Sequence, residues 1–147
     1  MQEKNNQEEL SENERKKMYL KSYKWAVRRV QGILDEIQRL RMDKMFPSLV
    51  NDGMPRGCNQ SDMSEFVARV DEEIEKLEKE LLEKIKIYSD IQIKIGIMDN
   101  EAEKEVLRLR YIVYINDESW ETIANEMGYC LRRVHTIHSN ALKHFKL

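Results

Sequence analysis

The residues at the C-terminal end of the chain have the types that contact nucleic acid. Residues 131–147 contain four basic residues, three histidines and no acidic residue. In a helix over 131–145, counted at 100° per residue, one face carries side chains suited to phosphates and to base edges in a major groove. The residues on this face or at its edge are Arg132, Arg133, Thr136, Ser139, Asn140 and Lys143. The pattern predicts contact with double-stranded DNA, and the alternative is a helical face that is merely solvated.

The segment before this helix has the features of a helix-turn-helix. Ser119 can cap a short helix, WETIANEM, which ends at Gly128. Two short helices that cross steeply need a small residue at the crossing, a turn residue that tolerates positive φ, and apolar anchors on both helices. These positions are occupied by Ala124, Gly128, Ile123, Met127, Val134 and Ile137. With a further helix over about 101–114, capped by Asp99, we predict a three-helix module over 99–147.

Two long helices are predicted upstream of this module. Apolar residues three and four positions apart predict helices over 17–46 and 63–98. The linker between them, 47–62, holds both prolines and two of the five glycines. Residues 1–16 are almost wholly polar and are interpreted as a loose tail or a frayed helical extension. Alternating isoleucines between 85 and 97 also fit a strand, but helix is preferred because the chain offers no partner strand.

The charges of the two long helices are complementary. Residues 17–46 have a net charge of +5, and residues 63–98 have a net charge of −3. We therefore predict an antiparallel, coiled-coil-like hairpin whose edges attract. Two helices alone leave wider apolar flanks uncovered, which indicates a homodimer through the hairpin or packing against the C-terminal module. These flanking residues are Trp25, Val27, Leu34, Phe66 and Leu82.

The composition predicts an all-α protein and excludes several classes of function. Seven glycines and prolines in 147 residues are too few for a sandwich or barrel of many strands. No apolar run is long enough to span a membrane, and the N-terminal sequence lacks the apolar stretch of a signal peptide. Cys58 and Cys130 form no paired motif, so we expect a reducing cytoplasm. No catalytic motif, cofactor loop or metal-ligand pattern is present, and His135, His138 and Cys130 are too few for a metal site.

The sequence resembles region 4 of sigma-70-type transcription factors over LRLRYIVYINDESWETIANEMGYCLRRVHTIHSNALKHF. Residues 18–147 also resemble a family of small phage and prophage proteins from Gram-positive bacteria, through YLKSYKW near the start and GMPRGCNQSD in the linker. The resemblance implies a cytoplasmic transcription regulator that acts on promoter DNA and contacts RNA polymerase. Carried over by position, it places Arg132, Arg133, Thr136 and Asn140 against bases and Trp120, Thr122 and Lys143 against phosphates.

The resemblance departs from its pattern at Cys130. Sigma-like sequences have Ser or Thr at the start of the recognition helix, and a thiol is a poorer cap by about 1 kcal/mol. The sequence shows no recognisable region for the −10 promoter element, so we do not expect these residues to act as a complete sigma factor by themselves. Two other functions fit the same features. One is a DNA-packaging protein similar to a phage terminase small subunit, and the other is a helical adaptor or structural protein that binds no DNA.

Overall fold

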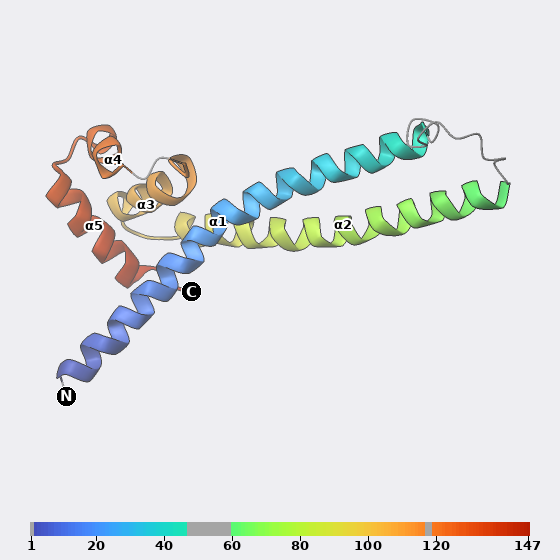
Figure 1. Ribbon diagram of the computed structural model, residues 1–147. Coiled ribbons are helices and arrows are strands. Elements are labelled where there is room, and N and C mark those ends of the chain that lie inside the picture. Colours follow the sequence, from blue (N-terminus) through green and yellow to red (C-terminus); the bar gives the residue numbers. More distant parts are fainter. Residues whose placement is uncertain (1, 47–59, 117–118) are drawn as a thin grey trace. The chain divides into compact units, whose positions relative to one another are not determined.

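The computed structural model describes the backbone of residues 2–46, 60–116 and 119–147. It describes the side-chain surroundings of 12–46, 63–116 and 119–147. All secondary structure in these ranges is helical, which confirms the predicted fold class (Figure 1). The elements are α1 (Gln2–Met45), α2 (Gln60–Gly96), α3 (Glu101–Arg108), the π-helix η2 (Leu109–Val113), α4 (Trp120–Met127) and α5 (Leu131–His144).

The two long helices follow the sequence prediction, with small changes at their ends. Helix α1 stops at Met45, as expected because Pro47 disfavours a helical conformation in the residue before it. It begins at Gln2, so the polar segment is helical as well. Helix α2 continues to Gly96, which confirms the helical alternative for 85–97 over the strand. The predicted linker, 47–62, lies outside the described residues except for its last three, which begin α2.

The chain forms two compact units that share the long helices. One unit consists of Val27–Lys86, and the other combines Met1–Ala26 with Ile87–Leu147. Both α1 and α2 therefore contribute one part to each unit. The sequence-based division into 1–16, 17–98 and 99–147 stays a prediction about independently folding parts.

In the unit Val27–Lys86, α1 and α2 pack side by side along an apolar seam (Figure 1). Ile33, Ile37 and Val70 are buried there. Burial of these side chains is the main stabilising contribution, because exposed ion pairs are worth only ~0.2–1 kcal/mol each.

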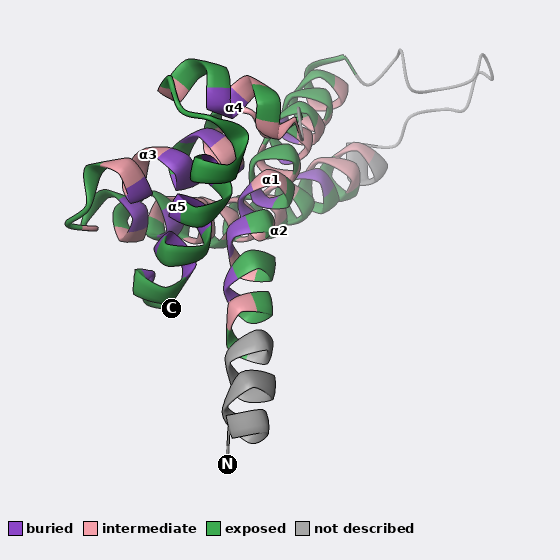
Figure 2. Ribbon diagram, turned by 90° about the vertical axis from the view of Figure 1, so that its left-hand side faces the viewer, coloured by how far each residue is buried: buried purple, intermediate pink, exposed green. Residues whose placement is uncertain are grey.

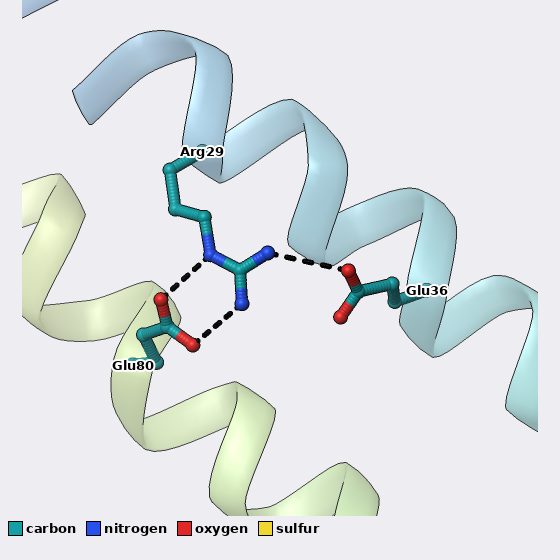
Figure 3. A network of polar contacts seen from close by, with 3 residues as sticks. All are labelled: Arg29, Glu36 and Glu80. Carbon is teal, nitrogen blue, oxygen red and sulfur yellow. Dashed lines mark hydrogen bonds and ion pairs between the residues drawn. The ribbon is translucent and has the colours of Figure 1, made fainter. Parts of the chain in front are cut away.

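Ion pairs across the hairpin confirm that its two edges attract. Arg29 Nε donates to one oxygen of Glu80 at 2.7 Å and its guanidinium reaches the other at 2.8 Å (Figure 3). The third guanidinium nitrogen of Arg29, Nη1, donates to Glu36 on α1 at 3.2 Å. Further along, Lys44 Nζ lies 2.6 Å from Asp71. Higher numbers on α1 pair with lower numbers on α2, so the helices are antiparallel.

The unit that contains α3, α4 and α5 has two clusters of buried residues. Figure 2 shows buried stretches on α1, α3, α4 and α5. The first joins Leu20 and Tyr23 of α1 and Ile91 and Ile95 of α2 to the inner face of the C-terminal module. Its members from that module are Leu107, Tyr111, Ala141, Leu142 and Phe145. The second cluster lies within the module and consists of Val106, Leu109, Ile123, Ala124, Val134 and Ile137. The long helices therefore supply part of the core on which the module rests.

The helix predicted over about 101–114 begins at Glu101 as expected, but its cap and its winding after Arg108 differ from the prediction. Asn100, and not Asp99, is the N-cap, since its side-chain oxygen accepts hydrogen bonds from the Ala102 and Glu103 N–H groups. After Arg108 the helix widens into η2, where the Tyr114 N–H donates to the Leu109 carbonyl at 2.9 Å. Leu109 packs in one buried cluster and Tyr111 packs in the other. The wider turn of η2 therefore lies where the helix contributes side chains to both clusters.

Candidate nucleic-acid interface

The start and end of α4 are set by local chemistry, as predicted. Ser119 has extended backbone angles, and its hydroxyl accepts a hydrogen bond from the Thr122 N–H at 3.4 Å. Gly128 adopts φ 68° and ψ 27°, in the left-handed region that favours glycine. The Tyr129 N–H then donates to the Ala124 carbonyl at 3.1 Å. These bonds close the turn and direct the chain into α5.

The anchor positions predicted for the helix-turn-helix are confirmed. Ala124 is 5 % exposed, small enough for α4 and α5 to approach each other closely. Ile123 and Val134 are fully buried, Ile137 is buried beside them, and Met127 packs against the same cluster. The contact between α4 and α5 is therefore apolar, and it fixes which face of α5 is left outside.

The outer face of α5 carries every side chain that the sequence predicts for DNA contact from this helix. The buried residues of α5 are Val134, Ile137, His138, Ala141 and Leu142. Val134, Ile137, Ala141 and Leu142 belong to the two buried clusters, so they define the inner side of the helix. The predicted contact residues are all exposed: Arg132, Arg133, Thr136, Ser139, Asn140 and Lys143. The face thus presents guanidinium, hydroxyl, amide and ammonium groups, which are the donors and acceptors that read bases and bind phosphates.

Two hydroxyls on this face are bound to the helix itself. The Thr136 hydroxyl donates to the Arg132 carbonyl at 3.0 Å, and the Ser139 hydroxyl donates to the His135 carbonyl at 3.0 Å. Each hydroxyl oxygen keeps lone pairs that can accept a further bond. Both side chains are therefore held close to α5 in fixed positions.

Cys130 directly precedes α5, and its side chain does not cap the helix, as expected for a thiol. Its backbone is extended at φ −71° and ψ 153°, but its side chain makes no capping hydrogen bond. The thiol is free and exposed. The first turn of α5 therefore has no side-chain cap from Cys130, while the Arg133 and Val134 N–H groups donate to the Cys130 carbonyl.

The two predicted phosphate contacts on α4 lie in its first turn and are half-buried. The centroid of the Trp120 ring lies 4.6 Å from that of His135 and 4.8 Å from that of His138. The Arg110 guanidinium also lies over the Trp120 ring, 4.4 Å from its centroid. Thr122 is the residue whose N–H is capped by Ser119. Trp120 thus packs against α5. Trp120 and Thr122 both belong to α4, so they lie next to the outer face of α5 and are not part of it.

Behind the outer face, His138 and Tyr111 form a buried polar pair. A hydrogen bond of 3.0 Å joins the Tyr111 hydroxyl to His138 Nε2. Burial is the main reason that the pKa of His138 falls to about 4, and the nearby charges of Lys17, Arg110 and His135 lower it further. Burial also raises the pKa of Tyr111 to about 12. At neutral pH both groups are uncharged, which agrees with the interpretation of His138 as a packing residue.

The C-terminal end of α5 is held by residues that no sequence pattern singles out. The buried Lys16 of α1 donates to the Lys143 carbonyl at 3.4 Å, and its ammonium pairs with Glu12 at 2.9 Å. The buried Glu103 of α3 lies 2.8 Å from His144 Nδ1. A cation at the last carbonyls of a helix is favourable. The contacts with α5 join residues that are distant in the sequence, so the spacing of residues along the chain could not predict these contacts.

Other kinds of site receive no support from the described residues. Within them, no group of three or more histidine, cysteine, aspartate or glutamate side chains could hold a metal ion. None of the helices in the described ranges is long and apolar enough to cross a membrane. Cys58 lies outside the described residues.

Comparison with known proteins gives one match. Residues 100–146 match the family described as Sigma-70, region 4. No curated protein and no solved structure matches the chain. The matched stretch covers α3, η2, α4 and α5, the elements that build the turn, the inner apolar face and the outer polar face described above. The C-terminal part of this chain is therefore a helix-turn-helix similar to sigma-70 region 4, a DNA-binding kind of module.

Proposed function

We propose that this chain is a sequence-specific, double-stranded-DNA-binding transcription regulator. The observation that carries the proposal is the outer face of α5, where six exposed polar or basic side chains lie on a helix that has no acidic residue. Arg132, Arg133, Thr136 and Asn140 contact base edges, and Lys143 contacts a phosphate. Ser139 lies among them on the same face.

Trp120 and Thr122 complete this proposed interface from α4. Both lie in the first turn of that helix, where backbone N–H groups and the helix dipole favour a phosphate. The proposed role is binding and not catalysis, and it places the protein in the bacterial cytoplasm. RNA polymerase is a further proposed partner, supported by the match of residues 100–146 to sigma-70 region 4. A phage or prophage source is proposed from the resemblance of the N-terminal and linker motifs alone.

Binding should be tested on the full chain, because the target sequence is unknown. Duplexes enriched from a random pool are titrated alongside unselected duplexes at several salt concentrations. A regulator binds the enriched duplexes more tightly, and both affinities fall steeply as salt rises. Binding to no duplex at low salt, with and without bacterial RNA polymerase, contradicts the proposal and leaves the adaptor alternative. Ring-shaped oligomers with a packaging-site preference favour the terminase-like alternative.

A single substitution tests whether α5 reads bases. Replacing Arg132 by Ala should lower the preference for the enriched duplex by about 1–3 kcal/mol if Arg132 contacts a base. Arg39→Ala removes the same charge from an exposed position of α1 and serves as the matched control. An equal loss on enriched and unselected duplexes would assign Arg132 to a phosphate contact.

A further inference from the structure

A surface pocket lies beside α5, on the side where α1 passes. Its volume is about 360 Å³, and its walls come from four elements of the same compact unit. Helix α1 contributes Lys17 and Lys21, and α5 contributes the exposed His135 and Ser139. Arg110 of η2 and Trp120 of α4 form further parts of the wall. The pocket is thus continuous with the proposed DNA-contacting face.

The described residues that line this pocket include basic and aromatic side chains but no aspartate or glutamate. Lys17 and Lys21 are exposed. The ion pairs found among the described residues include neither lysine. The positive charges around the pocket also act on His138, the buried histidine in its wall. Burial lowers its pKa most, and the charges of Lys17, Arg110 and His135 lower it further. A neutral His138 therefore lies beneath a cluster of cationic side chains.

The basic residues continue along α1 beyond this pocket. Lys17, Lys21 and Lys24 are spaced by four and three residues, which places them on one face of the helix. Lys21, Lys24 and Arg110 also line a neighbouring pocket of about 150 Å³. The three lysines span about 10 Å along the helix axis, a length over which one DNA strand carries about three phosphates.

We propose that this pocket binds a backbone phosphate of the DNA that flanks the site read by α5, with Lys17 and Lys21 of α1 as its main contacts. Lys24 extends the same contact to the next phosphate. The inference rests on the proposed function, and it adds residues that lie outside the stretch matching sigma-70 region 4. DNA is the occupant because the pocket opens beside His135 and Ser139, on the helix that meets the groove.

The test compares two double variants of the full chain. Lys17→Gln with Lys21→Gln removes two charges from the pocket, and Lys76→Gln with Lys79→Gln removes two exposed charges from the hairpin. The pocket variant should lose affinity on the order of tenfold to a hundredfold at ~0.1 M salt, equally on enriched and unselected duplexes. The slope of log affinity against log salt concentration should also be smaller in magnitude by about two, one for each phosphate that the variant no longer neutralises.

A phosphate-interference footprint locates the same contact on the DNA. With the unmodified chain, phosphates beside the site read by α5 should be sensitive, and this sensitivity should disappear in the pocket variant. If the chain binds DNA but both double variants match it in affinity, salt slope and footprint, the pocket is not a DNA contact, and the proposed function still stands. If the chain binds no duplex at all, the proposed function fails, and this inference fails with it.

Discussion

The buried His138 of α5 contacts Tyr111 and Trp120. It is the buried one of the three histidines, and it lies between the Tyr111 hydroxyl and the Trp120 ring. Its pKa of about 4 means that the folded chain keeps it neutral at a pH where an unfolded chain, with a pKa near 6.5, protonates it. The unfolded state therefore binds more protons between these values, and acid favours unfolding.

Replacing His138 by Gln should remove this contribution while keeping a polar group for Tyr111. As pH falls from 6.5 to 4, the free energy of unfolding of the unmodified chain should drop by on the order of 3 kcal/mol more than that of the variant. Denaturant unfolding at several pH values measures the difference. His135→Gln, an exposed neighbour on the same helix, is the control. Parallel pH curves for the unmodified chain and His138→Gln would contradict the assignment.

Residue chemistry that acts over a few positions could be predicted from the sequence. Ser119 and Gly128 are recognisable because a cap and a left-handed turn each require particular residue types. The choice of Asn100 over Asp99 as a cap could not be predicted, since both side chains are able to cap. The role of Lys16 could not be predicted either, because its partner, the Lys143 carbonyl, is distant in the sequence.

The turn between α4 and α5 depends on the left-handed backbone conformation of Gly128. A β-carbon added at Gly128 would meet no atom within 4 Å, so its cost comes only from the positive φ. Gly128→Ala should therefore lower the free energy of unfolding by about 1–2 kcal/mol. Thermal or denaturant unfolding measures this loss.

The same substitution at Gly32 is the matched control, with the opposite sign. Gly32 lies inside α1 and also has no atom within 4 Å of an added β-carbon. Gly32→Ala should raise the free energy of unfolding by about 0.5–1 kcal/mol, because Ala favours helix. If both substitutions change stability in the same direction, the turn is not limited by the φ of Gly128.

The elements themselves were largely predictable, but their partners were not. Apolar spacing predicts both long helices, and opposite charges predict their antiparallel pairing, which the bond between Arg29 and Glu80 confirms. The sequence left open whether the flanks of the hairpin meet another copy or the C-terminal module. Tyr23 and Ile91 are buried against that module, whereas Trp25 remains 66 % exposed. Which side chains are covered depends on long-range packing that periodicity does not encode.

We propose that the chain forms a homodimer through the hairpin. The support is apolar surface left outside in the unit Val27–Lys86, where Leu34 is 45 % and Leu82 is 60 % exposed. A two-fold dimer would also suit paired half-sites in DNA. Sedimentation velocity over a range of concentrations should give the mass of two chains.

Leu34→Glu should shift this equilibrium towards the monomer, because it removes apolar surface from the proposed contact. Gln38→Glu adds the same charge one helical turn away without removing apolar surface, and it should weaken association less. A single-chain mass at every concentration, for the unmodified protein as well, would refute the dimer.

The shared core has a consequence for how genes of this kind can change. The stretch that resembles sigma-70 region 4 rests on Leu20, Tyr23, Ile91 and Ile95, which are encoded outside it. Recombination that replaced this stretch with a foreign counterpart would bring in an inner surface shaped for other neighbours. If α5 reads DNA as proposed, point substitutions on its outer face, where Arg132 and Asn140 are exposed, would change the target preference with less disturbance of the core than exchange of the whole segment.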